Sequence, residues 1–355
     1  MLQKIVVSVF AMSLINSSFA QDSTKPVSPL SVNGSADLYY KYDFGKTKAN
    51  NLTSFTNSHN SFELGMASVK LDYKSTKVEL VADLGFGKRA QEFSYNDQGI
   101  LQAVKQLYMS YSATPWLKLT AGTWATHVGY ELVDAYANRN YSMSYMFTNG
   151  PFFHTGAKAE VSYGVSGFMV GIANPTDYKY VPDGVLNHKT FIAQYSYAPS
   201  DRFKAYLNLV TGDNTDTSKG HQYDIVLTSK LSDKFSLGYN GTINRTTHYL
   251  GKNEFEKTKS WWGSALYLNF DASKTFGLTL REEYFNDDNQ LKMFAAQPKG
   301  GNIFASTLSA NIRVDNFIFI PEFRLDNASQ TLFTNSDGKP TKVAANILFA
   351  AVYQF

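Results

Sequence analysis

Apolar and polar residues alternate with a period of two along much of this chain, and helical periodicity is scarce. Within residues 317–326, Phe319 and Phe323 share one face, and Glu322 and Arg324 share the other. This alternation is typical of β-strands that have one apolar and one polar face. Because charged side chains need water, we expect the polar faces to line a wet interior.

Sixteen segments show this pattern, and most of them contain 10 to 14 residues, which suits a tilted strand that crosses a bilayer. Residues 274–285 contain one exception, Glu282, which falls on the apolar face. The predicted strands are 31–44, 61–74, 76–87, 101–113, 116–126, 152–163, 165–174, 188–199, 202–212, 221–231, 234–245, 258–271, 274–285, 303–315, 317–326 and 342–355.

The connections between these segments alternate strictly between short and long. The short ones are Ser75, Thr114–Pro115, Gly164, Ser200–Asp201, Ser232–Asp233, Ala272–Ser273 and Asn316. The long ones are 45–60, 88–100, 127–151, 175–187, 213–220, 246–257, 286–302 and 327–341. Short turns on one rim and long loops on the other are the layout of bacterial outer-membrane barrels. The pattern therefore predicts an all-β, antiparallel up-and-down barrel with periplasmic turns and extracellular loops. Aromatic residues beside the short turns support that membrane boundary.

The last predicted strand ends at Phe355 and carries an apolar residue at every second position from Val343 onward. Its final residues, Tyr353 and Phe355, resemble the C-terminal signature of outer-membrane proteins that the barrel-assembly machinery reads. An unpaired strand edge cannot stand in lipid, so we expect this strand to pair with residues 31–44.

The chain begins with the features of a secretory signal. Lys4 precedes an apolar run from Ile5 to Ile15, and Ser18-Phe19-Ala20 has the small residues of a cleavage site. We therefore expect a signal peptide over 1–20, a short periplasmic segment over 21–30 and a single barrel domain over 31–355. A buried N-terminal helix is the alternative.

Composition agrees with export to the outer membrane. Aromatic residues make up 15% of the chain, yet its mean hydropathy is −0.27. After residue 20, no run approaches the roughly 18 apolar residues of a membrane helix. The chain has no Cys, which excludes disulfides, and its net charge of +3 is spread out, which indicates no nucleic-acid partner.

The longest connection, 127–151, reads from His127-Val-Gly-Tyr-Glu through Asn-Arg-Asn-Tyr-Ser to Asn-Gly-Pro151, and Phe152-Phe153-His154-Thr155-Gly156 follows it. This succession resembles the β-barrel porin-2 family, also called OmpL-like, and the resemblance covers residues from about 30 to 355. It implies an outer-membrane porin of the general type.

In sixteen-stranded general porins the third loop folds into the lumen and narrows it. By that resemblance, 127–151 is a constriction candidate, and its charged or titratable residues His127, Glu131, Asp134 and Arg139 are candidates to set the field at the neck. The Pro-Glu-Phe-Gly-Gly eyelet of enteric porins is absent. An ordinary extracellular loop with solvated charges is the alternative.

Alternation also predicts which charged wall residues face the lumen, with ten cations against ten anions. From this balance we expect no strong ion selectivity. The cations are Lys41, Lys70, Lys77, Lys118, Lys158, Lys204, Lys230, Arg281, Arg313 and Arg324. The anions are Asp37, Asp43, Asp72, Glu79, Asp83, Glu160, Asp224, Glu283, Glu322 and Asp326. Lys105 breaks the alternation, so we expect it near the upper interface or beside a bulge, and we expect a bulge at Pro321.

The sequence shows no catalytic or metal-binding constellation. The six His are scattered without metal-ligand spacing on one strand, and no Ser and His are placed together convincingly. We therefore expect no enzyme activity, cofactor or metal; an outer-membrane enzyme, such as a phospholipase or protease barrel, is the alternative.

The leading hypothesis is passive diffusion of small hydrophilic solutes and ions through a water-filled barrel in the outer membrane of a Gram-negative bacterium. A substrate-selective channel and a structural or adhesion barrel with partner-binding loops are the alternatives. The expected partners are outer-membrane lipid and lipopolysaccharide, the barrel-assembly machinery, small solutes or ions, and further copies of the chain in a homotrimer.

Overall fold

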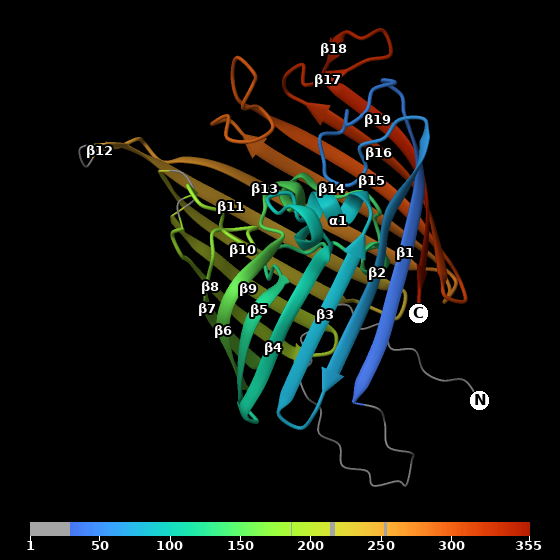
Figure 1. Cartoon of the computed structure of the whole chain (residues 1–355). Helices are drawn as coiled ribbons and strands as arrows, with labels where there is room; N and C mark the ends of the chain where they lie inside the picture. Colours follow the sequence, from blue (N-terminus) through green and yellow to red (C-terminus); the bar gives the residue numbers. More distant parts are fainter. Residues whose placement is uncertain (1–28, 186, 214–216, 252–253) are drawn as a thin grey trace.

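In the computed structural model, which describes residues 29–185, 187–213, 217–251 and 254–355, sixteen long antiparallel strands form one closed barrel (Figure 1). Each long strand pairs with the next one along the chain, which confirms the predicted fold class. The strands are β1 (Leu30–Asp43), β2 (Ser61–Lys74), β3 (Val78–Phe86), β4 (Val104–Thr114), β5 (Leu117–Ala125), β6 (Phe153–Tyr163), β7 (Ser166–Ala173), β8 (Thr190–Ser200), β9 (Phe203–Asp213), β10 (Ser218–Lys230), β11 (Phe235–Gly251), β13 (Lys259–Asp271), β14 (Phe276–Asp287), β15 (Gly301–Val314), β16 (Phe317–Ala328) and β19 (Val343–Gln354).

The barrel closes between its first and last strands, as expected. β1 and β19 pair from Ser35 opposite Gln354 to Asp43 opposite Asn346. The backbones of Gly34 and Phe355 exchange two further hydrogen bonds, each of 3.0 Å. The predicted signal peptide and residues 21–28 lie outside the described part of the chain.

Several short elements lie in the connections. The second loop contains α1 (Lys88–Phe93) and the 3₁₀ helix η1 (Gly99–Ala103), and the third contains the 3₁₀ helix η2 (Ala135–Ala137) and α2 (Tyr145–Asn149). The paired segments β12 (Glu254–Phe255), β17 (Phe333–Thr334) and β18 (Pro340–Thr341) belong to long loops. Figure 1 shows α1 inside the ring of strands. Among the described residues, no helix is long and apolar enough to cross a membrane.

Burial alternates along the strands as the sequence pattern predicts. On β14, Thr279, Arg281 and Glu283 are almost completely buried, whereas Phe276 on the other face is 38% exposed. The buried face is the inner one, because its side chains contact loops that lie inside the barrel. The outer face is rich in exposed aromatic and aliphatic side chains, which suits contact with lipid.

Two irregular positions test the strand predictions. The register between β3 and β4 shifts between Asp83, opposite Gln106, and Leu84, opposite Val104, so Lys105 is the extra residue of a bulge, the second of the two expectations for it. The bulge turns Lys105 inward, where it lies 3.0 Å from Asp83. The bulge expected at Pro321 is wrong, because the registers of β16 with β15 and with β19 do not shift there. Instead, Ile320 and Pro321 form no ladder pair with β15, so the sheet accommodates a proline, which has no N–H group to donate, without an inserted residue.

Glu282 is the exception on the outer face of β14. It pairs with Leu266 on β13 and with Ser306 on β15, and the Ser306 hydroxyl donates a 2.6 Å hydrogen bond to its carboxylate. Leu280 and Tyr284 flank it on the same face. A carboxylate in the middle of this apolar band is costly in lipid.

Replacing Glu282 with Leu is therefore expected to stabilise the barrel by about 1–2 kcal/mol in lipid vesicles, less than the cost of a cation at the same depth. Reversible urea unfolding in vesicles measures the change. Glu282→Gln, which keeps an acceptor for Ser306, should give a smaller gain. Loss of stability in Glu282→Leu would show that this face meets protein rather than lipid.

Candidate functional site

The third loop (residues 127–151) leaves the end of β5 and folds into the barrel, where it first meets β8 to β11. The His127 Nε2 atom lies 3.2 Å from the Leu209 carbonyl, and the Gly129 N–H donates a 3.1 Å hydrogen bond to Asp224. Val128 packs in a buried apolar cluster with Trp124 and Met169. This first part of the loop is therefore fixed to the inner wall.

The next part of the loop crosses to β14 and β16, where two buried arginines hold its backbone. Arg281 donates to the Ser142 carbonyl at 2.7 Å, and Arg324 donates to the Met143 carbonyl at 2.6 Å. The strand registers place both arginines at one level, on either side of Thr307. Arginine suits this position because its planar group donates several hydrogen bonds and keeps its charge when buried.

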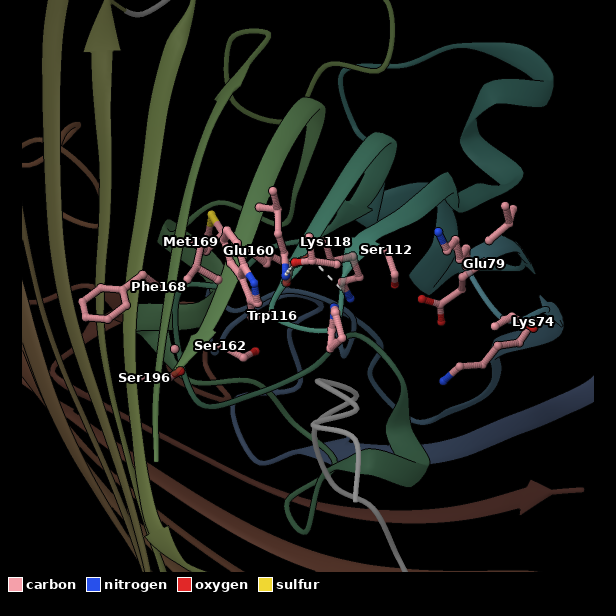
Figure 2. Close-up of a pocket in the computed structure, with 18 of the residues that line it drawn as sticks. Lys74, Glu79, Ser112, Trp116, Lys118, Glu160, Ser162, Phe168, Met169 and Ser196 are labelled. Atoms are coloured by element: carbon pink, nitrogen blue, oxygen red, sulfur yellow. Dashed lines mark hydrogen bonds and ion pairs between the residues drawn. The ribbon is translucent and has the colours of Figure 1, made fainter. Parts of the chain in front are cut away.

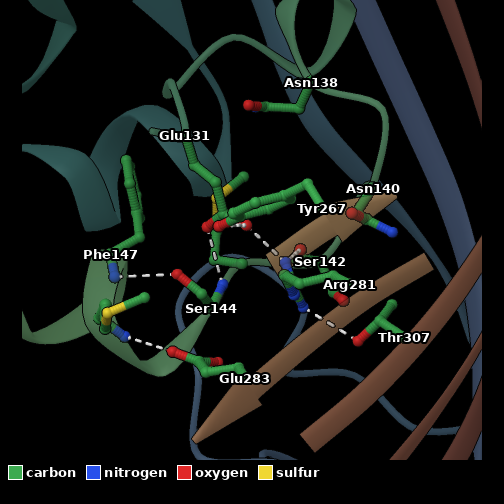
Figure 3. Close-up of polar contacts among 12 residues, drawn as sticks. Glu131, Asn138, Asn140, Ser142, Ser144, Phe147, Tyr267, Arg281, Glu283 and Thr307 are labelled. Atoms are coloured by element: carbon green, nitrogen blue, oxygen red, sulfur yellow. Dashed lines mark hydrogen bonds and ion pairs between the residues drawn. The ribbon is translucent and has the colours of Figure 1, made fainter. Parts of the chain in front are cut away.

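Two wall carboxylates complete this attachment by accepting backbone N–H groups. Glu322 accepts from Tyr141 and Ser142 at 2.8 and 3.1 Å. Glu283 accepts from Tyr145 and Met146 at 2.8 Å each, as Figure 3 shows in part. Hydrogen bonds to charged groups contribute about 1.5–3 kcal/mol each, so segment 141–146 is held firmly.

Glu131 links two parts of the third loop to the wall. Its carboxylate accepts from Arg281 at 2.5 Å and from the Ser144 N–H at 2.8 Å, and the Tyr267 hydroxyl donates to it at 3.2 Å (Figure 3). The neighbouring Tyr130 ring stacks on Tyr267, with 4.0 Å between the ring centroids. The loop is thus braced against itself and against β13 and β14.

Glycines on the inner wall make room for this packing. A Cβ atom at Gly238 on β11 would overlap the Tyr130 ring, and one at Gly263 on β13 would overlap Met146. These positions require glycine because the loop approaches the strand backbone closely.

The first and second loops pack against the third and fill the space between it and the wall. Phe55 of the first loop and Phe93 of α1 join Phe147 and Phe152 in one buried cluster. Arg89 of α1 is fully buried and lies between the rings of Phe55 and Tyr141. Its guanidinium also lies 3.7 Å from Asp37 on β1. Three loops therefore obstruct the part of the lumen that β13 to β16, β19 and β1 enclose.

The lumen is open beside the short turns of β3 to β8, at the periplasmic end of these strands. A cavity of about 140 Å³ that opens to solvent lies over the inner face of β3 to β8. Figure 2 shows Ser112, Lys118, Glu160 and Ser196 among its lining residues. Lys118 and Lys158 both lie 3.4 Å from Glu160. Lys118, whose side chain is 31% exposed, remains in contact with water, whereas Glu160 is nearly buried between the two lysines.

The predicted wall residues divide between these two regions. Lys41, Asp224, Arg281, Glu283, Glu322 and Arg324 are buried against inward-folded loops, and Lys41 donates to the first loop. The other members, Lys70, Lys118, Lys158, Lys204 and Arg313, are partly accessible, and Lys158 is the least so, with 13% of its side chain exposed.

The structure places the four constriction candidates at separate points of the third loop. His127 and Glu131 are buried, with 8% and 5% of their surface exposed. Asp134 bonds to Lys105 at 2.5 Å, and Arg139 bonds to Asp271 at 2.5 Å. Asp134 and Arg139 keep partly exposed side chains, so they contact water in the lumen.

The structure also brings together residues that the sequence did not associate. The rings of His127 and His154 lie 5.2 Å apart inside the barrel. Nevertheless, the described residues contain no group of three or more His, Cys, Asp or Glu side chains arranged to hold a metal ion. Arg89 was also missed, because its loop shows no periodic pattern that reports burial.

A closed sixteen-stranded barrel with an apolar outer wall and an inward third loop defines an outer-membrane barrel of the porin type. The sequence matches, over residues 29–355, the model of the family described as "Putative beta-barrel porin-2, OmpL-like". The chain belongs to this family, which confirms the resemblance found in its sequence.

Solved structures with the same fold agree with this assignment. The anion-selective porin from Comamonas acidovorans has a TM-score of 0.61 at 9% identity, over 92% of this chain and 99% of that chain. The outer-membrane channel DcaP of Acinetobacter baumannii has a TM-score of 0.60, and OmpT of Vibrio cholerae has 0.58, each at 11% identity over 92% of this chain and 97% of that chain. No curated protein sequence matches significantly.

Asp177 of the fourth loop (residues 175–187) anchors the residues that directly follow the third loop. Its carboxylate accepts the N–H groups of Phe152 and Phe153 at 2.7 and 3.0 Å, and the Tyr95 hydroxyl at 3.0 Å. Burial raises the pKa of Asp177 from 3.8 to about 6, because the backbone donors only partly offset the loss of water.

This raised pKa predicts a pH dependence of stability. The folded state keeps a proton on Asp177 that the unfolded state releases, so this contribution is complete below about pH 4 and is lost as the pH rises to about 6. Relative to Asp177→Asn, which cannot titrate, the wild type should lose up to about 3 kcal/mol between pH 4 and pH 7. Urea unfolding of both proteins in vesicles measures this difference. A difference that does not change with pH would contradict the assignment.

Proposed function

We propose that this protein is a passive diffusion channel for small hydrophilic solutes and ions. The observation that carries the proposal is the uneven filling of the barrel. The third loop is bonded to β14 and β16, whereas the inner face of β3 to β8 borders a solvent-open cavity. A sixteen-stranded wall is wide enough to hold both a folded loop and a water path.

The attachment of the third loop supports a fixed constriction rather than a mobile flap. Its backbone is held by Arg281, Glu283, Glu322 and Arg324, all buried. Removing one partner from such a buried network costs several kcal/mol. We infer that the size of the opening is set by these wall residues. Asp134 and Arg139 remain the candidates to set the local field.

We also propose contacts with the assembly machinery, with lipopolysaccharide and with further copies of the chain. The outward row of β19 supports the first, since Phe349 and Phe355 are 54% and 60% exposed. One OmpT structure of Vibrio cholerae, with a TM-score of 0.58 at 11% identity, is described as a trimer form, which supports a homotrimer here.

Single-channel recording in planar bilayers tests the proposed function. The purified protein should give stable, stepwise conductance increments in potassium chloride. A flat trace from protein that shows the heat-modifiable gel mobility of a folded barrel would contradict it.

The same recording tests the role of the loop attachment. The double variant Glu283→Gln and Glu322→Gln weakens four hydrogen bonds to the loop backbone, so it should show a larger or noisier open current. Glu282→Gln is the matched control, since it removes a carboxylate from the outer face of β14. Equal currents in the double variant and the control would show that these carboxylates do not set the opening.

A further inference from the structure

The inward charges of the wall are balanced in number but not in access to water. Of the ten inward cations, only Lys41, Arg281 and Arg324 are buried. Of the ten inward anions, only Asp72 and Glu79 are accessible. Seven accessible cations of this set therefore face two accessible anions, and Asp271 on β13, whose side chain is 29% exposed beside Arg313, adds a third, which leaves an excess of four positive charges among these residues. The buried anions are Asp37, Asp43, Asp83, Glu160, Asp224, Glu283, Glu322 and Asp326.

The hydrogen-bonding demand of the inward-folded loops accounts for part of this asymmetry. A loop buried inside a barrel exposes backbone N–H groups that need acceptors. Wall carboxylates supply them: Glu283 and Glu322 accept two each, and Asp224 accepts that of Gly129. Lysine has no acceptor, and most of the wall lysines lie away from the loops. Folding of the loops thus withdraws negative charge from the water path.

Two of the accessible cations lie in the open part of the lumen, and others lie on neighbouring strands of the same wall. Lys77 and Lys118 line the cavity over β3 to β8. Lys158 lies beside Lys118, and the two lysines share the single carboxylate of Glu160. Lys204 on β9 is partly exposed and forms no ion pair in the described structure. Figure 2 shows Lys118 and Glu160 together in this cavity.

We propose that this lysine-lined path selects small anions, such as halides and carboxylates, over cations. The proposal rests on the proposed channel function and names the class of solute that the channel favours. Charges of one sign along a low-dielectric wall raise the local concentration of the opposite ion. Rings of Lys and Arg act in this way in anion pores. The net positive charge of this path differs from the zero net charge that is predicted by counting inward-facing charged residues in the sequence.

Reversal potentials across a potassium chloride gradient test the proposal. The wild type should give a chloride-to-potassium permeability ratio above one. The triple variant Lys118→Gln, Lys158→Gln and Lys204→Gln should bring this ratio close to one. The matched control, Lys257→Gln, Lys299→Gln and Lys339→Gln, removes three exposed charges from outer loops and should keep the wild-type ratio. Cation preference in the wild type, or an unchanged ratio in the triple variant, would overturn the proposal.

A second variant and a second readout keep the test decisive. Lys77→Gln with Lys204→Gln removes two cations that form no ion pair in the described chain, so it should fold even if loss of both partners of Glu160 harms the triple variant. Trp116 lines the cavity and is 54% exposed, so its fluorescence reports local ions without requiring current. Iodide should quench the Trp116 fluorescence more strongly than caesium does. The difference between the two quenchers should be smaller in the Lys77→Gln, Lys204→Gln variant.

The two readouts separate the two proposals. Preferential iodide quenching without any conductance would overturn the channel function and keep the anion site. Conductance that favours potassium, together with equal quenching by iodide and caesium, would overturn the anion site and keep the channel.

Discussion

Backbone hydrogen bonding in lipid is the constraint on which this structure depends. No peptide group can remain unpaired within the hydrocarbon layer, so the sheet must close on itself. The ladder between β1 and β19 achieves this closure, and Phe355 bonds to Gly34 at its end. The closed ring then fixes which residues point inward. A register slip of one residue would place Arg281 and Glu283 in lipid.

The same demand for hydrogen bonds continues inside the barrel. The third loop has little regular structure, so its backbone groups bond to wall side chains instead. Arginines on β14 and β16 donate hydrogen bonds to its carbonyl groups, and glutamates on the same strands accept hydrogen bonds from its N–H groups. The charges used in this way no longer face water. The attachment of the loop therefore also shapes the electrostatics of the water path.

Much of the barrel could be predicted from the sequence because membrane strands impose a period of two and alternate turn lengths. The sixteen strands, their closure and the bulge beside Lys105 followed from this pattern. The bulge expected at Pro321 was wrong, since the sheet tolerates a proline there by omitting ladder pairs. Loop residues such as Arg89 and Asp177 could not be predicted. Their roles depend on contacts between loops far apart in sequence, and no local pattern encodes these contacts.

Loops fill one part of the lumen, and we infer that the other part carries water. Because the chain has no native Cys, introduced thiols report access to water directly. Ser112→Cys, in the cavity wall, should react rapidly with a charged methanethiosulfonate reagent, whereas Ser309→Cys, which is fully buried beside Asn140, should be protected. Equal reaction rates at the two positions in folded protein would contradict this account.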